Sequence, residues 1–209
     1  AQALAERFGW VAKEGLLGGT HCASDGFLRP HLVYNEGARR ILELGGALHQ
    51  KAPVTGATCQ GDRLSAVHTP KGTFEADLFI DCTNAWTRRL STVLGGAPLD
   101  VEPLKRYLWF LARGGTMSAE TLAGMPLTIT PQGGYCRPEN ANTLMMGKKH
   151  DTPPDWSFSY EDQDHIEAEY SHDGGIDAKP FELWMELAAA IPELEAFDGF
   201  QATTGGYYA

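Results

Sequence analysis

The stretch DGFLRPHLVYNEGARRILELGG, residues 25–46, decides the fold class. Its first residues, Asp25-Gly26, are typical of a turn, and Pro30 suits the first position of a helix, where its missing N–H is not needed. Apolar residues then recur at helical spacing, at Tyr34, Ala38, Ile41 and Leu42. Gly45-Gly46 supplies the left-handed backbone that ends such a helix. We therefore predict a helix over residues 30–44.

Short β-forming runs separated by turn residues follow this helix. The segments predicted to be extended are residues 47–50, 53–59, 64–68, 73–75 and 78–80. Turns at Gly61-Asp62 and Pro70-Lys71-Gly72 connect the middle three segments into a meander. The last segment, Leu78-Phe79-Ile80, is apolar and short enough for a buried strand. A short helical pattern then covers residues 87–94.

The chain changes character after residue 98, where β-forming pieces alternate with turn residues. Strands are predicted at residues 101–112, 127–130, 135–137, 143–148 and 200–208, and helices at 161–170 and 180–190. The apolar face of the last helix is formed by Phe181, Trp184, Leu187, Ala188 and Ile191. This pattern indicates a two-part α/β (α+β) protein whose second part is a mainly antiparallel sheet with flanking helices.

Composition excludes some partners. The 209 residues carry a formal net charge of −10 and no cluster of Lys or Arg, so we expect no nucleic-acid partner. Residues 151–177 hold nine Asp and Glu and no Lys or Arg, which favours a solvated acidic loop and helix over a docking surface. No apolar run approaches the length of a membrane span, and the first ten residues lack the order of a signal peptide.

The candidate metal ligands and thiols show no site pattern. Cys22, Cys59, Cys82 and Cys136 form no C-x-x-C pair, and none of the seven histidines belongs to an H-E-x-x-H motif. We therefore expect buried reduced thiols, no metal site and a cytoplasmic location. No G-x-S-x-G motif supports an acyl-transfer triad.

Short motifs follow one another in a characteristic order. They are Asp25-Gly26-Phe27-Leu28-Arg29-Pro30, Gly46-Ala47, Val54, Val67-His68-Thr69, Gly72, Ala76-Asp77, Asn84-Ala85-Trp86 and the final Thr203-Thr204-Gly205-Gly206-Tyr207-Tyr208-Ala209. Their order and spacing resemble the D-amino-acid oxidase, glycine oxidase and sarcosine oxidase family of FAD-dependent oxidoreductases. The resemblance assigns residues 29–98 and 199–209 to part of an FAD-binding domain, and residues 1–28 and 99–198 to a substrate domain.

The resemblance implies FAD as cofactor and names its contacts. Val54 would offer its backbone to the adenine, and the turn that follows residues 78–80 would approach the cofactor closely. The turn residues are Thr83, Asn84, Ala85 and Trp86. Asn84 replaces the Gly that is usual in the family, and because Asn tolerates left-handed backbone angles we expect the turn to survive. No G-x-G-x-x-G occurs in the sequence, so we expect these 209 residues alone to retain no tightly bound FAD.

Candidate substrate contacts also come from the resemblance. Tyr135-Cys136-Arg137-Pro138-Glu139 is similar to a Y-Y-R-P-E strand of the family, which implies that Tyr135 and Arg137 line the catalytic site. Arg suits a carboxylate because it can bind both oxygens at once. The alternative is that Arg137 pairs with Glu139 and only orders the sheet. Further candidates for the substrate pocket are Lys105, Arg106 and Tyr107, of which one would face the pocket, and Tyr207 with Tyr208. The alternatives are a surface location for the two cations and simple packing for the two tyrosines.

Two functions remain open at this point. In the first, an FAD-dependent enzyme oxidises a C–N bond of a small amine or amino acid, transfers hydride to the flavin, and passes electrons to oxygen or to an electron-accepting protein. In the second, a non-catalytic subunit or binding module retains the flavoprotein scaffold without turnover.

Overall fold

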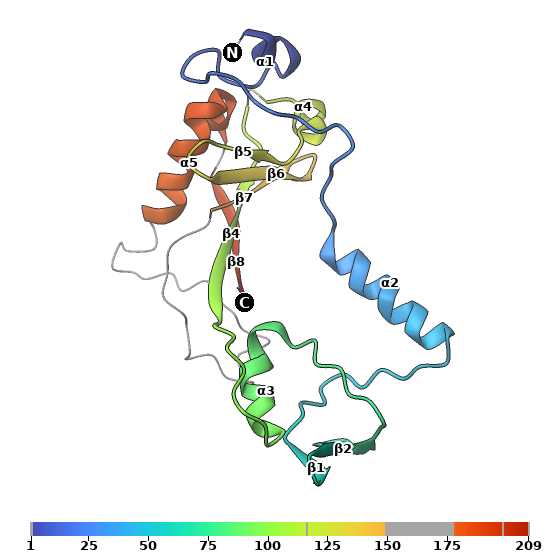
Figure 1. The fold of residues 1–209 in the computed structure, drawn as a ribbon. Coiled ribbons are helices and arrows are strands. Elements are labelled where there is room, and N and C mark those ends of the chain that lie inside the picture. Colours follow the sequence, from blue (N-terminus) through green and yellow to red (C-terminus); the bar gives the residue numbers. More distant parts are fainter. Residues whose placement is uncertain (1, 116, 149–177, 198, 209) are drawn as a thin grey trace. The chain divides into compact units, whose positions relative to one another are not determined.

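A computed structural model describes residues 2–115, 117–148, 178–197 and 199–208 (Figure 1). The chain divides into two compact units. Within the described residues, the first unit comprises positions from 2–27, 106–148 and 178–206, and the second comprises 28–105 and 207–208. Each unit contains its own antiparallel sheet, so the α/β (α+β) class predicted from the sequence is confirmed. The helix predicted over residues 161–170 lies outside the described residues.

The first unit is built on a five-stranded sheet in the order β5-β6-β7-β4-β8. The strands are β4 (Leu104–Ala112), β5 (Thr128–Ile129), β6 (Gly134–Asn140), β7 (Thr143–Lys148) and β8 (Phe200–Tyr208). The pairs β4–β7, β5–β6 and β6–β7 are antiparallel, as predicted. The first residues of β4 and the last residues of β8 belong to the second unit.

Helix α5 (Ala178–Ala190) covers one face of this sheet and contacts β6 and β7 (Figure 1). The buried cluster between helix and sheet includes Trp109, Leu111, Cys136, Leu144, Met146, Leu183, Leu187 and Ile191. The predicted apolar face of α5 needs one correction, because Phe181 is 57% exposed and Leu183 is buried in its place. Two short helices that the sequence did not predict, α1 (Gln2–Arg7) and α4 (Ala119–Gly124), complete the unit.

Glu186 joins α5 to the sheet. Its carboxylate accepts hydrogen bonds from the Gly134 N–H at 2.8 Å and from the Thr130 hydroxyl, and it forms an ion pair with Lys148. Burial alone would raise the pKa of Glu186, but the hydrogen bonds and the Lys148 charge outweigh it, so the pKa lies below its ordinary value. This network holds the helix at the beginning of β6 and the end of β7.

The second unit contains helix α2, a three-stranded sheet and helix α3. Their bounds are α2 (Pro30–Glu43), β1 (Gly56–Gln60), β2 (Arg63–Thr69), β3 (Gly72–Glu75) and α3 (Thr87–Val93). The predicted helix over 30–44 and the meander are therefore confirmed. Pro30 begins α2, and Gly45 follows its end with a φ of +84°. The helix therefore begins at a proline and ends before a glycine, as the sequence predicted.

Three expectations about burial and strands are wrong. Residues 47–50 and 78–80 form no strand, and Leu78 and Ile80 are 74% and 77% exposed. A buried strand needs neighbours on both edges and both faces, and none of the described strands pairs with 78–80. The thiols differ too, since Cys136 is buried whereas Cys22, Cys59 and Cys82 are exposed.

Candidate functional site

The register of the first unit's sheet sorts its side chains onto two faces. Tyr135 lies opposite Gly147, which lies opposite Leu108, so these three residues share one face. Their neighbours Cys136, Met146 and Trp109 point to the other face, into the cluster beneath α5. We call the first face the arginine face and define it by Leu108, Ile129, Tyr135, Arg137, Met145 and Gly147.

Arg137 is held in place by three contacts. Its Nη1 lies 2.7 Å from Oε2 of Glu139 and donates to the carbonyl of Pro138 at 3.1 Å. Its guanidinium carbon lies 4.5 Å from the centroid of the Phe27 ring, within the range of a cation–π contact. The Arg137 side chain is 12% exposed and that of Glu139 is 30% exposed. The pairing with Glu139 that the sequence offered as an alternative is therefore present.

The hydrogen bonds that the described residues make with Arg137 all use Nη1. An arginine can bind a carboxylate in two-point fashion through the edge formed by Nε and Nη2. The contact with Glu139 does not use this edge.

Tyr135 covers Gly147. A Cβ atom on Gly147 would lie 2.5 Å from the hydroxyl oxygen of Tyr135 and 2.9 Å from Cδ2 of Leu108, which is closer than real Cβ contacts allow. The glycine thus lets the tyrosine ring lie flat across β7 toward β4. Sequence reasoning missed Gly147, although a glycine inside a strand pattern is a signal of close approach by another group.

A hollow of about 470 Å³ adjoins Phe27. Its lining includes Asp25 and Gly26 from the turn before α2, and Leu127 and Ile129 from β5 and the residue before it. Phe27 lines this hollow and also contacts the guanidinium of Arg137. The turn that the sequence assigned to the beginning of α2 therefore also supplies an aromatic wall beside the arginine.

The structure does not bring all the predicted pocket residues together. Tyr107 alternates with Leu108, so it points to the face opposite Arg137, where it packs against the buried cluster with its ring centroid 6.1 Å from that of Trp109. Arg106 is two residues from Leu108 and has the register of the arginine face. Arg106 rather than Tyr107 therefore has the same parity as the residues of the arginine face, and Lys105 precedes it in β4.

The turn over residues 83–87 has the predicted backbone. Asn84 has a φ of +51°, in the left-handed region, while Ala85 is 1% exposed and anchors the turn. The N–H and the hydroxyl of Thr83 donate to Oδ1 of Asp81 at 2.8 and 2.6 Å. Burial would raise the pKa of Asp81, but hydrogen bonds from Thr83 and Thr87 outweigh it and lower that pKa. The expectation that Asn84 preserves the turn is confirmed.

A hollow of about 590 Å³ opens beside this turn. Its lining is Asn84, Thr87, Asp100, Val101 and Glu102. Carboxylates repel a pyrophosphate but accept hydrogen bonds from hydroxyl groups, so these walls fit the sugar-like hydroxyls of a dinucleotide better than its phosphates.

The remaining cofactor candidates lie in the same unit. Val54 is half-buried just before β1 and is not part of the hollow at Asn84. The rings of Trp86 and Tyr207 meet edge to face, with centroids 6.1 Å apart and an interplanar angle of 83°. Tyr207 therefore packs against the turn that carries Asn84, whereas the sequence assigned it to the substrate pocket.

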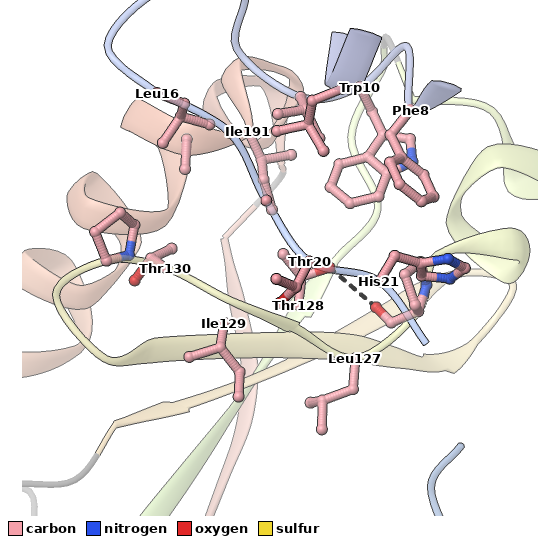
Figure 2. A pocket seen from close by; sticks show the side chains of 17 residues that line it. Phe8, Trp10, Leu16, Thr20, His21, Leu127, Thr128, Ile129, Thr130 and Ile191 are labelled. Carbon is pink, nitrogen blue, oxygen red and sulfur yellow. Dashed lines mark hydrogen bonds between the residues drawn. The ribbon is translucent and has the colours of Figure 1, made fainter. Parts of the chain in front are cut away.

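A separate apolar hollow of about 410 Å³ lies between the N-terminal segment, β5 and the end of α5 (Figure 2). Its apolar walls include Phe8, Trp10, Leu16 and Ile191. Figure 2 shows Ile129 of β5, and Leu127 just before it, extending to the opposite side from Thr128. None of the site residues predicted from the sequence lines this hollow.

Within the residues that the structure describes, no group of three His, Cys, Asp or Glu could hold a metal ion. No helix there is both long and apolar enough to cross a membrane.

Comparison with known families decides the relationship that the motifs suggested. A family model described as FAD dependent oxidoreductase matches residues 1–206. The chain belongs to this family. The resemblance to the D-amino-acid oxidase, glycine oxidase and sarcosine oxidase group is thus confirmed, and FAD is the cofactor of the family.

Solved structures of several enzymes share the fold. L-proline dehydrogenase from P. horikoshii superposes with a TM-score of 0.78 at 18% identity, over 100% of this chain and 51% of that one. Glycine oxidase from Geobacillus kaustophilus matches with a TM-score of 0.53 at 19% identity, over 78% of this chain and 38% of that one. Iminodiacetate oxidase from Chelativorans sp. BNC1 gives 0.57 at 15% identity, over 85% and 42%. The chain therefore spans about half or less of the length of these proteins.

Proposed function

We propose that the protein of which this chain forms part oxidises a C–N bond of an amino acid or amine and transfers hydride to FAD. The observation that carries the proposal is Arg137, an arginine that is 12% exposed on the arginine face and oriented by Phe27 and Glu139. The relatives named L-proline dehydrogenase, glycine oxidase and iminodiacetate oxidase support it, because their names describe amino-acid or amine substrates.

In this proposal the residues of the arginine face have different roles in binding the substrate. Arg137 binds the substrate carboxylate through Nε and Nη2, and Phe27 keeps the guanidinium plane fixed. Tyr135 provides an aromatic wall beside it, resting on Gly147. FAD supplies the two-electron acceptor, while the protein orients the substrate and limits the access of water.

The second unit holds part of the cofactor in this proposal. The backbone turn at Thr83, Asn84 and Ala85 approaches the hydroxyl-bearing portion of FAD, Trp86 supports the turn from behind, and Val54 offers backbone groups to the adenine. A cytoplasmic location, and transfer of electrons to oxygen or to a protein acceptor, belong to the same proposal.

A non-catalytic binding module is the second candidate. The observation that favours it is the ion pair between Arg137 and Glu139. In this second candidate the arginine is paired within its own strand, orders the sheet, and binds no substrate.

Anaerobic flavin reduction separates the two candidates. The full-length protein, loaded with FAD, is mixed with a panel of amino acids, N-alkyl amino acids and simple amines, and the loss of the yellow flavin absorbance is followed. The proposal predicts stoichiometric reduction by at least one of these C–N donors. Reduction by α-hydroxy acids alone, or by no compound in the panel, would contradict it.

A further inference from the structure

The apolar hollow of about 410 Å³ in the first unit has the size and the lining of a small-molecule site (Figure 2). Such sites usually measure about 300–1,000 Å³ and combine apolar walls with a few polar groups. The walls come from three parts of this one unit: the N-terminal segment, residues 126–131 around β5, and the end of α5. Ile191 on the last of these walls is 1% exposed and belongs to the buried cluster, so the core supports the hollow.

The polar groups of the hollow carry no negative charge. Among the described residues that line it, the polar side chains are three threonines and one histidine, Thr20, Thr128, Thr130 and His21, and none is Asp or Glu. The hydroxyls of Thr128 and Thr130 donate to the carbonyls of Pro126 and Gly134. His21 is the one ring among these polar groups.

Arg7 lies beside His21 and determines which hydrogen bond this histidine can offer. Nη2 of Arg7 is 3.0 Å from Nδ1 of His21. A guanidinium can only donate, so Nδ1 is the acceptor and the hydrogen of the neutral ring is on Nε2.

Phe8 holds the same two side chains together. The guanidinium carbon of Arg7 lies 5.4 Å from the centroid of the Phe8 ring, and the rings of Phe8 and His21 meet edge to face with centroids 5.1 Å apart. Phe8 and His21 both line the hollow. The positive charge of Arg7 is therefore held against two residues of its lining.

We propose that this hollow binds a small organic anion, a carboxylate that carries an apolar chain. The chain lies against Trp10, Leu16 and Ile191, while the carboxylate accepts from Nε2 of His21 and pairs with Arg7. An ammonium in the same place meets the charge of Arg7 with no acid in the lining to offset it. The inference goes beyond the proposed function, because binding here involves neither the flavin nor a C–N bond.

Three compounds that share one chain and differ in the charge of the head group test the site. They are octanoate, 1-octanol and octylamine, and their dissociation constants are measured by titration calorimetry on the FAD-loaded full-length protein. The wild type should bind octanoate about tenfold more tightly than 1-octanol, in keeping with one charge-assisted hydrogen bond, and octylamine more weakly than 1-octanol. Equal binding of octanoate and 1-octanol, or binding of neither, would overturn the inference.

Arg7→Gln tests the charge at the hollow. It should weaken octanoate about fivefold, because the ion pair is exposed, and leave 1-octanol unchanged. Lys13→Gln removes the same charge from an exposed position of the same segment that does not line the hollow, and it should change neither constant. Equal effects of the two variants would show that octanoate responds only to net charge, which contradicts the site.

Two neighbouring leucines test the place of binding. Leu16 lines the hollow and is half-buried, whereas Leu17 is 101% exposed and is not part of the lining. Leu16→Ala should weaken octanoate and 1-octanol alike, by about three- to tenfold, because both lose apolar contact. Leu17→Ala should weaken neither, and equal behaviour of the two variants would place the ligand elsewhere and overturn the inference. Flavin reduction does not enter these measurements, so the proposed function stands or fails separately.

Discussion

Tyr135 and Gly147 face each other across β6 and β7, and the tyrosine ring occupies the space that a side chain at position 147 would need. Gly147→Ala should therefore displace Tyr135 and lower the free energy of unfolding by about 1–3 kcal/mol, the usual cost of overpacking. Urea denaturation of the variant and the wild type measures this difference.

Gly124→Ala is the control for that substitution. A Cβ at position 124 meets no atom within 4 Å, and the residue ends α4 without a left-handed backbone angle. Its stability should be unchanged or slightly raised. If the two variants behave alike, Tyr135 does not rest on Gly147.

The Glu186 network gives the first unit a predictable pH response. The folded-state pKa of Glu186 lies below its ordinary value, so its stabilisation is fully present above the unfolded pKa and is lost as the pH falls through the folded pKa. Glu186→Gln should lower the free energy of unfolding by about 1–3 kcal/mol at neutral pH. The difference should shrink as the pH falls below the ordinary pKa of a glutamate and should vanish only when the pH has passed below the lowered pKa of the folded state.

Denaturation midpoints of both proteins across this pH range provide the measurement. Glu195→Gln, at an exposed position, serves as reference and should show no comparable pH-dependent loss. A gap between Glu186→Gln and the wild type that widens on acidification would mean that the carboxylate does not stabilise the fold.

The left-handed backbone of Asn84 predicts a size-dependent series. Asn84→Gly should retain full stability, because glycine adopts a φ of +51° without cost. Asn84→Val should lose about 1–2 kcal/mol, because a β-branched residue is strained there. Thermal melting checks both variants, and equal melting temperatures would contradict a left-handed turn.

The four thiols should react in a definite order. Burial raises the pKa of Cys136 to about 12, and this residue is shielded from solvent. Cys22 is exposed, and hydrogen bonds from Ser24 lower its pKa. Iodoacetamide at neutral pH should label Cys22 first, Cys59 and Cys82 next, and Cys136 only after unfolding, as followed by peptide mass spectrometry. Native labelling of Cys136 at the rate of Cys82 would contradict the burial.

Elements that depend on local pattern could be predicted from the sequence. The proline at the beginning of α2 and the glycine after its end act on the backbone within a few residues of themselves. The β1-β2-β3 meander likewise depends only on the turns between its own strands. The exposure of Leu78 and Ile80 could not be predicted in the same way, because it depends on which segments pack against them.

The candidate site shows the same division. Motif resemblance identified Tyr135 and Arg137, and the structure places both on one sheet face. It could not choose between Arg106 and Tyr107, because a strand alternates its side chains and only the register with β7 decides which parity shares a face with Arg137. The contact of Phe27 with Arg137 could not be predicted, because it joins segments far apart in the chain. The contact of Gly147 with Tyr135 depends on the register between β6 and β7, which the sequence does not determine by itself.

The central claim, that Arg137 binds the substrate carboxylate, is tested most directly by Arg137→Ala in the FAD-loaded full-length protein. The measurement is kcat/KM for an amino acid and for the amine that lacks its carboxylate, with Arg63→Ala, an exposed arginine, as control. Loss of a charge-assisted contact predicts a fall of about 100-fold for the amino acid and little change for the amine. An equal fall for both compounds would show that Arg137 only orders the sheet and would contradict the claim.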